Sequence, residues 1–363
     1  MNKAHFPHYK AILNNIDLAY YLICKNIPVE IPENATVEEL WDLHKKIAKL
    51  FKENLKHGNL GRKSEIDTSY LDLKVKISQK MLQECEFCEN QCHIDRRSGE
   101  LGYCGIPVIS RVSSAFLHHG EEPPLVPSGT IFFSGCTFGC VFCQNWDIST
   151  IGKHHQPPLR NGYENEMKRS NGTAVDGKQL ALFADMLARQ GARNVNYVGG
   201  DPTPNLHTII ESMKHQTQNI TQLWNSNFYN SISALDLIID LMDFWLPDFK
   251  YGNNECAKKY SNINHYWEIL TRNLKFLYEW GSREIIIRHL VMPGHFECCT
   301  KPILKWISKQ IPGTVTNLMS QYHPEHRVTS LHYPEINRRV SHSEMIEAFS
   351  LAERLNIPYR FVS

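Results

Sequence analysis

Residues 130–149 read TIFFSGCTFGCVFCQNWDIS, and they join a buried apolar strand directly to three cysteines. Cys136, Cys140 and Cys143 follow a Cys-x3-Cys-x2-Cys spacing, which lets one short loop bind three corners of an iron–sulfur cube. A closed structural zinc site needs four protein ligands. The spacing therefore predicts a [4Fe-4S] cluster in which one iron is open to another molecule. A zinc loop completed by a histidine and a group of buried thiols are the alternatives.

Strands and helices alternate downstream of this loop, and this pattern implies a parallel sheet with right-handed crossovers. Predicted strands lie at 130–135, 194–200, 221–227, 243–250, 283–294 and 314–322, and predicted helices at 178–190, 204–214, 231–239, 299–310 and 343–355. About six repeats predict an α/β fold, a partial (β/α)6 TIM-like barrel. Active sites of such barrels lie at the carboxyl ends of the strands.

The chain is predicted to have three parts. Residues 1–84 form an N-terminal helical extension, residues 85–126 a Cys-rich metal-binding knuckle, and residues 127–363 the partial barrel. Within the extension, Thr36 followed by Glu39 predicts the start of a helix. The polar segment 151–172 is predicted to be an exposed loop that could act as a lid or a docking loop.

The knuckle carries four cysteines within twenty residues, namely Cys85, Cys88, Cys92 and Cys104. Four thiolates can close a site for zinc or hold an iron–sulfur cluster. The spacing leaves both possibilities open, beside that of no metal at all. Arg96 and Arg97 are interpreted as a solvated basic turn.

Composition excludes several classes of protein. The net charge of +1 gives no argument for nucleic acid or an anionic membrane as partner. No apolar run reaches the length of a membrane span, and the N-terminus lacks a secretory pattern, so we expect a cytoplasmic protein. Eleven cysteines in a reducing compartment indicate metal binding. Four of them are interpreted as ordinary thiols: Cys24, Cys256, Cys298 and Cys299.

The three-cysteine loop resembles that of the radical S-adenosylmethionine (SAM) superfamily. The resemblance implies that the open iron binds the amino and carboxylate groups of SAM. It also implies that Phe142 is the aromatic residue that precedes the last cysteine of the motif. One electron passed to the sulfonium would release methionine and a 5′-deoxyadenosyl radical, which abstracts hydrogen from a substrate.

The same resemblance predicts contacts to SAM or substrate at the strand ends. The predicted residues are Gly199, Gly200, Asp201, Asn225, Asn227, Asp248, Lys250 and Arg288. The first three are similar to a glycine-rich element that contacts the SAM amino group. The last three belong to LPDFKYG and IIIRHLVMPGH, which resemble elements of glycyl-radical-enzyme activases. The two asparagines are predicted to contact the ribose, and His289 is interpreted as a packed, hydrogen-bonded residue rather than a proton donor.

Several segments together resemble the PflX subgroup, whose members are named as pyruvate formate-lyase activating enzyme-like proteins. They are residues 85–105, 130–149, LPDFKYG, IIIRHLVMPG, LMSQYHP and YPEINRR. The resemblance implies an enzyme with a peptide or protein substrate and an electron donor such as flavodoxin or ferredoxin. Radical modification of a small molecule or RNA, and a non-enzymatic iron–sulfur or zinc scaffold, are the alternatives.

Overall fold

The computed structural model describes residues 6–57, 66–151 and 172–360. Its helices are α1 (Pro7–Leu13), α2 (Tyr20–Lys25), α3 (Val37–His57), α4 (Tyr70–Met81), α5 (Trp146–Ser149), α7 (Gly177–Arg189), α8 (Leu206–His215), α9 (Ile232–Ile238), α10 (Asn254–Ser261), α11 (Tyr266–Trp280), α12 (Lys301–Gln310) and α13 (His342–Arg354). Its strands are β1 (Ser110–His118), β2 (Ser128–Phe133), β3 (Thr173–Val175), β4 (Asn194–Gly199), β5 (Thr221–Ser226), β6 (Phe244–Pro247), β7 (Ile286–Leu290), β8 (Val315–Met319) and β9 (Tyr359–Arg360).

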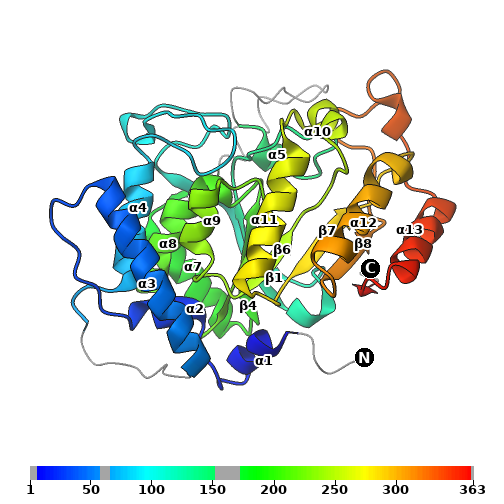
Figure 1. Cartoon of the computed structure of the whole chain (residues 1–363). Coiled ribbons are helices and arrows are strands. Elements are labelled where there is room, and N and C mark those ends of the chain that lie inside the picture. The colour runs from blue at the N-terminus through cyan, green and yellow to red at the C-terminus, as the bar shows by residue number, and fades with distance from the viewer. Residues whose placement is uncertain (1–5, 58–65, 152–171, 361–363) are drawn as a thin grey trace.

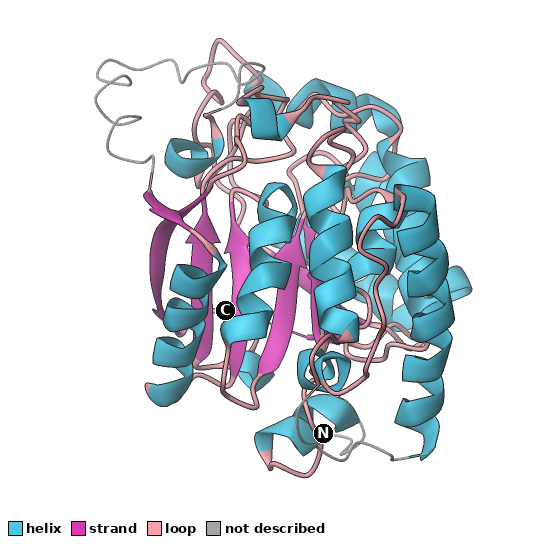
Figure 2. Ribbon diagram, turned by 90° about the vertical axis from the view of Figure 1, so that its left-hand side faces the viewer, coloured by secondary structure: helices cyan, strands magenta, loops and turns pink. Residues whose placement is uncertain are grey.

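Six parallel strands confirm the predicted partial barrel. One sheet has the order β3-β1-β2-β4-β5-β6, and a second has the order β7-β8-β9. Strands β2, β4, β5 and β6 are parallel, as are β7 and β8. Two parallel bridges, Trp245 to Ile285 and Asp248 to Arg288, connect β6 with β7. Figure 2 shows the strands side by side with helices on the outside.

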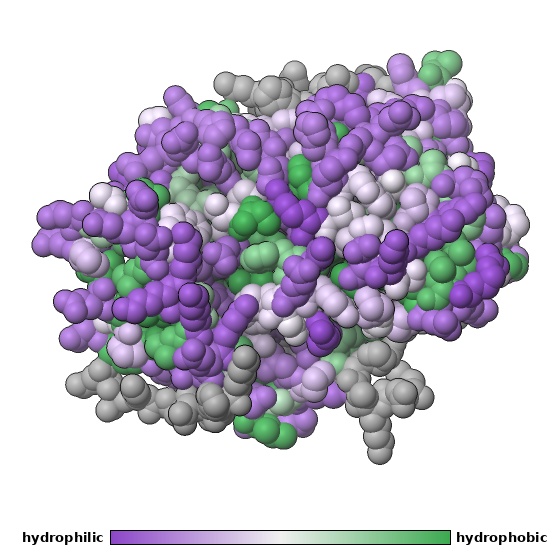
Figure 3. Space-filling view, in the orientation of Figure 1, coloured by the Kyte–Doolittle hydropathy of each residue, from purple (hydrophilic) through white to green (hydrophobic). Residues whose placement is uncertain are grey.

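The central strands are buried because helices cover the sheet. All six residues of β5, TQLWNS, are buried, as expected for a parallel strand that is enclosed on both faces. Trp224 and Trp245 are among the largest fully buried side chains. Residues on the outside are mostly hydrophilic in the view of Figure 3, with smaller hydrophobic areas between them. Within the described residues, no helix has the length and apolarity of a membrane span.

Three strands, β1, β3 and β9, were not predicted from the sequence. β1 pairs antiparallel with β2 and with β3, so the sheet begins upstream of residue 127. β1 has no clear alternation of apolar and polar residues, since Ser110 is buried while Phe116 is 43% exposed. β9 contains only two residues. β3 contains only three residues, and none of the three strands carries the periodicity that a sequence-based prediction requires.

The N-terminal helices pack on the barrel. α3 begins as predicted, because the Glu39 amide donates to Thr36 Oγ1 and the Thr36 amide donates to a Glu39 carboxylate oxygen. α4 packs against α3 on one side and against α8 on the other (Figure 1). The extension is therefore part of the barrel's outer layer.

The segment just before β7 contains a buried carboxyl group with an unusual pKa. Glu284 Oε1 accepts a hydrogen bond from the His8 amide, and burial raises the pKa of Glu284 to about 7. Because the pKa is higher in the folded state, this group contributes stability that is present below about pH 4.5 and lost as the pH rises through 7.

Glu284→Gln is expected to remove this pH dependence. The free energy of unfolding should change little at pH 5 and increase at pH 8 by up to about 3 kcal/mol, because an amide cannot ionise. Urea unfolding at both pH values measures the effect. Glu279→Gln is the control, since Glu279 is exposed. Equal pH dependence in Glu284→Gln and the wild type would contradict the assignment.

Candidate functional site

The predicted site residues gather around one cavity at the carboxyl ends of the strands. The cavity has a volume of about 220 Å³. The predicted residues that line it are Cys136, Cys140, Phe142, Cys143, Gly199, Gly200, Asn225, Asn227, Asp248, Lys250 and Arg288. They come from the ends of β2, β4, β5, β6 and β7. Parallel pairing aligns these strand ends and thereby brings together residues far apart in the sequence.

Each of the three sulfur atoms lies within hydrogen-bond distance of a polar side chain. The pairs are Asn227 Nδ2 with Cys136 Sγ at 3.3 Å, Ser261 Oγ with Cys140 Sγ at 2.9 Å, and Ser149 Oγ with Cys143 Sγ at 3.2 Å. Donors to sulfur orient thiolate ligands and tune the potential of a bound metal centre. The structure thus adds Ser149 and Ser261 to the predicted site.

Burial controls the protonation of these thiols. It raises the pKa of Cys136 and Cys140, and it raises that of Cys143 to about 12. At Cys140 the charge of Lys250 acts in the opposite direction. The metal-free thiols are therefore neutral near pH 7, and binding of iron would release their protons.

The end of helix α10 holds the cysteine loop. The amide of Gly139 donates to Ser261 O at 2.9 Å, and the amide of Val141 donates to Tyr260 O at 2.8 Å. The free carbonyl groups at the helix end thus find their partners in the loop. Sequence reasoning did not predict α10 or this contact.

The two glycines after β4 are required by backbone packing. A Cβ atom on Gly200 would lie 2.1 Å from Gly135 O, and one on Gly199 would lie 2.2 Å from Phe133 N. Gly199 also has a φ of +128°, which side chains disfavour. The glycines therefore let the end of β4 lie directly against the cysteine loop.

Asp201 faces the cysteine loop rather than the cavity. Its amide donates to Gly135 O at 2.9 Å, and its Oδ2 accepts from Thr137 Oγ1 at 2.6 Å. Asp201 is not part of the cavity lining. In this structure the carboxylate therefore positions the loop, and its predicted contact with the SAM amino group stays a prediction.

Gly200→Ala is expected to displace the cysteine loop. The new methyl group would overlap with backbone atoms that cannot rotate away, so we expect a loss of about 3 kcal/mol or more in the free energy of unfolding. Iron retention after reconstitution should fall as well. Urea unfolding and iron analysis measure both effects.

Gly177→Ala is the matched control for Gly200→Ala. A Cβ atom at Gly177 would lie 2.5 Å from Glu211 Cγ, which belongs to a flexible side chain that can move. We expect this control to retain iron and stability. Similar losses in the two variants would contradict the role of the close backbone approach.

Lys250 connects the carboxylate of Asp248 to Asn227, which contacts a cysteine of the loop. Its Nζ donates to Asp248 Oδ2 at 2.5 Å and to Asn227 Oδ1 at 2.8 Å. Asn227 in turn donates from Nδ2 to Cys136 Sγ. Asp248 and Lys250 therefore act as a pair, and Asn227 links this pair to the sulfur of Cys136.

Arg288 contacts two buried glutamates that were not predicted. Its Nη1 lies 3.6 Å from Glu121 Oε2, and its Nε lies 3.4 Å from Glu122 Oε1. Burial lowers the pKa of Arg288, but Glu122 and Glu121 outweigh this effect and hold it above its ordinary value. Buried consecutive glutamates need a cation. In the sequence, the signal for these residues was the acidic pair in HHGEEPP, residues 118–124.

Asn225 retains an unused donor at the cavity. Its Oδ1 accepts from Arg288 Nη1 at 3.3 Å. Among the described residues, its buried Nδ2 finds no acceptor. A buried donor without an acceptor is costly. A ligand oxygen in the cavity could accept from it.

His289 is packed as predicted. It is fully buried, with Nδ1 at 2.7 Å from Phe249 O and Nε2 at 2.9 Å from Thr300 Oγ1. Burial lowers the pKa of His289 to about 4. A neutral imidazole with both nitrogens occupied is not available for proton transfer.

The knuckle cysteines surround a separate enclosed cavity of about 20 Å³. Two groups of possible ligands in the described chain have all their ligand atoms within 4.8 Å, and neither contains a knuckle cysteine. The prediction of a solvated turn is wrong for Arg96. It is 1% exposed, and its Nη2 donates to Pro107 O at 2.7 Å, because the guanidinium fills the space beside the cysteines.

The loop predicted at 151–172 lies almost wholly outside the described residues, which resume at Gly172. Its predicted role as a lid or docking loop stays a prediction.

Comparison with known proteins identifies a family and a relative that covers most of the chain. A family model described as Radical SAM superfamily matches residues 130–307, which contain the cysteine loop and the strand ends at the cavity. An uncharacterized protein of Methanocaldococcus jannaschii is 39% identical over 349 residues, covering 96% of this chain and 97% of that protein. The predicted membership of the PflX subgroup stays a prediction.

Two solved structures show weaker likenesses. A domain of a pyruvate-formate lyase-activating enzyme from Bacteroides vulgatus is 14% identical, covers 46% of this chain and 97% of that chain, and has a TM-score of 0.38. A radical SAM methyltransferase from Sphaerobacter thermophilus is 11% identical, covers 66% of this chain and 67% of that chain, and has a TM-score of 0.45. Likenesses at this level are too weak to transfer a function.

Proposed function

This chain belongs to the radical SAM superfamily, and from that premise we propose that it is an enzyme whose adenosyl radical acts on a peptide or protein substrate. The observation that carries the proposal is the convergence of the three cysteines with Asp248, Lys250 and Arg288 on one cavity. The alternative substrates are a small molecule or an RNA base.

The residues present fit a cluster held by three thiolates. Cys136, Cys140 and Cys143 face one cavity, each beside a polar side chain, and they do not form a site for a single ion. When bound, a [4Fe-4S] cluster with SAM on its open iron supplies one electron to the sulfonium and thereby the 5′-deoxyadenosyl radical. The protein holds these groups in place and limits the access of water.

The chain offers polar groups where SAM would lie. Asn225 Nδ2 is a donor without an acceptor among the described residues, and we propose that it binds a ribose hydroxyl or the carboxylate of SAM. Lys250 and Arg288 line the same cavity with their charges balanced by Asp248, Glu121 and Glu122. Neutralised cations can still donate hydrogen bonds, so we propose that they orient SAM or the substrate rather than act as free charges.

A peptide substrate is supported by the elements that carry these residues. Asp248-x-Lys250 and Arg288 resemble the corresponding elements of glycyl-radical-enzyme activases, and they lie next to each other through the bridge between β6 and β7. The bridge brings both elements to the cavity wall, where they could contact a substrate backbone. An electron donor such as flavodoxin or ferredoxin is part of the proposal.

The knuckle is proposed as a second metal site. One zinc ion with bonds of about 2.3 Å would require its sulfur ligands to lie about 3.8 Å apart. Among the described residues, no three ligand atoms that lie within 4.8 Å of one another include a knuckle sulfur. All four knuckle cysteines nevertheless line one cavity. Zinc and an iron–sulfur cluster both remain candidates for this site. Separate zinc and iron analysis of a Cys88→Ala/Cys92→Ala variant decides between the two.

Product analysis tests the proposed reaction. The protein is reconstituted anaerobically with iron and sulfide, and then incubated with SAM and dithionite. We expect 5′-deoxyadenosine and methionine in equal amounts. Absence of 5′-deoxyadenosine from protein with a complete cluster would contradict the proposed reaction.

Deuterium transfer tests the substrate class. Extracts of cells grown on deuterated medium are separated into protein, RNA and small-molecule fractions, and each is added to the reaction. We expect deuterium in 5′-deoxyadenosine with the protein fraction, and we expect protease treatment of that fraction to remove the transfer. Transfer from RNA or from small molecules would replace the peptide proposal with one of its alternatives.

A further inference from the structure

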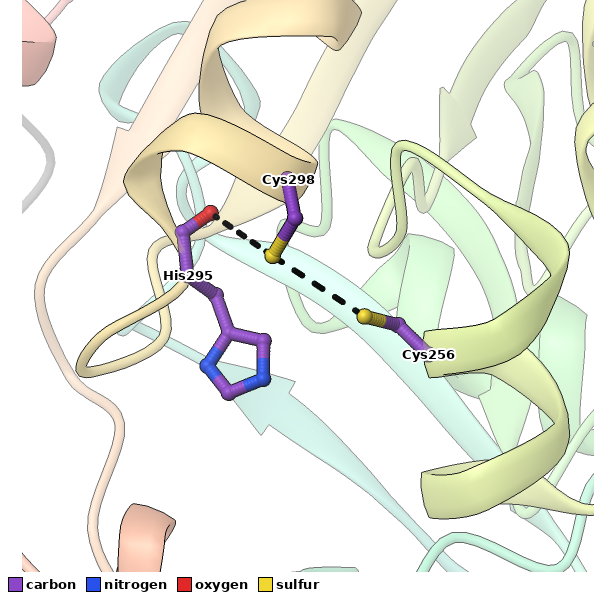
Figure 4. Close-up of side chains that lie close together, drawn as sticks. All are labelled: Cys256, His295 and Cys298. Carbon is purple, nitrogen blue, oxygen red and sulfur yellow. Dashed lines mark hydrogen bonds between the residues drawn. The ribbon is translucent and has the colours of Figure 1, made fainter.

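Three cysteines and one histidine lie close together near the start of α10, and none of them lines the cavity of either predicted metal site. Cys256 lies in α10, and His295, Cys298 and Cys299 lie between β7 and α12. The possible ligand atoms of Cys256, His295 and Cys298 all lie within 4.8 Å of one another. Figure 4 shows these three side chains, from two separate segments, pointing toward one another.

We propose that Cys256, His295 and Cys298 bind one zinc ion, and that Cys299, which lies outside the group of ligand atoms within 4.8 Å of one another, moves toward it to complete four ligands. The sulfur spacing carries the proposal, because Cys256 Sγ lies 4.0 Å from Cys298 Sγ, and Cys298 Sγ lies 3.8 Å from Cys299 Sγ. Four tetrahedral ligands with zinc–sulfur bonds of about 2.3 Å would place their sulfurs about 3.8 Å apart. Thiolates on separate irons of a cubane lie farther apart, so this geometry selects a single ion.

The histidine is held in the form that binds metal. His295 Nδ1 lies 2.8 Å from Pro293 O, and a carbonyl oxygen can only accept, so Nδ1 carries a proton. Nε2 is then the nitrogen available to a metal. This backbone contact is the usual outer partner of a metal-bound histidine. Tyr260 Oη, at 3.1 Å from Nε2, is the neighbour that an ion would replace or share.

Asn253 supplies further outer contacts. Its Nδ2 donates to Cys298 O at 2.8 Å and lies 3.5 Å from Cys256 Sγ and 4.0 Å from Cys299 Sγ. Its Oδ1 accepts from the Cys256 amide at 2.8 Å and thereby caps α10. The side-chain amide of Asn253 thus connects the first turn of α10 to the segment that carries Cys298 and Cys299.

The backbone on both sides is shaped for this contact. Cys298 and Cys299 lie in a π-helical turn, Phe296–Thr300, and such turns often accompany functional sites. A Cβ atom at Gly252 would lie 2.6 Å from Cys298 O, so only glycine permits this approach of the two segments. The ion would fix the start of α10, whose end holds the cluster loop through Tyr260 and Ser261. We infer a structural zinc site with four protein ligands.

Metal analysis of the full-length protein tests the site. We expect a Cys256→Ser/Cys298→Ser variant to contain about one zinc ion less per chain than the wild type, with its iron unchanged. Cys24→Ser is the control and should retain all zinc, because Cys24 lies outside every cysteine group described above. Zinc bound in the knuckle would be present in both proteins, so it does not affect the difference between their zinc contents. Equal zinc content in the wild type and the double variant would overturn the proposal.

A measurement on the wild type avoids any defect in folding of the variant. Cys298 is exposed, so iodoacetamide should modify it in metal-free protein and modify it much more slowly after addition of zinc. Peptide mass spectrometry locates the modification. Equal modification with and without zinc, or a disulfide among Cys256, Cys298 and Cys299 in freshly reduced and desalted protein, would overturn the proposal. These outcomes are independent of SAM cleavage.

Discussion

Replacing Cys140 by alanine is expected to abolish SAM cleavage. Loss of an outer partner of a metal ligand already costs about 10–100-fold in affinity or activity, and loss of the ligand itself should cost at least about 100-fold. Cys140 lies at the centre of the loop, and its sulfur is 2.9 Å from Ser261 Oγ. Formation of 5′-deoxyadenosine and iron content per chain measure the effect.

Two further variants separate ligand loss from general damage. Cys24→Ala removes a buried thiol elsewhere and should retain activity and iron. Ser261→Ala removes only the polar neighbour of Cys140, so we expect an intermediate loss. Wild-type iron content and activity in Cys140→Ala would contradict the assignment of the cluster ligands.

Replacing Lys74 by methionine is expected to destabilise the protein by about 3–5 kcal/mol, because it leaves a buried carboxylate without its partner. Lys74 is fully buried in α4, and its Nζ lies 2.5 Å from Asp240 Oδ1. The same Nζ donates to His44 Nε2 at 2.8 Å and to Leu237 O at 2.9 Å. Tyr70 Oη donates to the other oxygen of Asp240. Urea unfolding measures the change.

The double variant Lys74→Met/Asp240→Asn should recover much of this loss, because it removes the unpaired charge. Lys80→Met on the same helix is the control, and we expect a change within about 0.5 kcal/mol. A similar effect of Lys74→Met and Lys80→Met would show that this network does not hold the N-terminal helices on the barrel.

The parts of the fold that depend on local sequence could be predicted. Strands β2, β4, β5, β6, β7 and β8 were predicted from short runs of sequence, and a polar or glycine residue follows each of them except β7. Because parallel strands end at one face, the same runs also predicted which residues would meet there. α11 was missed although its buried residues, among them Ile269, Leu270 and Leu277, repeat at helical spacing.

Contacts between distant segments could not be predicted in this way. Cys256 and Cys298 are 42 residues apart, and no local spacing marks them as partners, so they were interpreted as ordinary thiols. Ser261 reaches Cys140 only because α10 ends above the loop. A single sequence shows the chemistry of each residue, whereas the arrangement of the strands and helices decides which residues meet.

Electron paramagnetic resonance of the reduced, reconstituted protein tests the central claim most directly. The claim is that Cys136, Cys140 and Cys143 leave one iron open to SAM. We predict a [4Fe-4S]+ signal whose g-values change when SAM is added. A cluster signal that SAM leaves unchanged, or tetrahedral zinc at this triad in place of iron, would contradict the account.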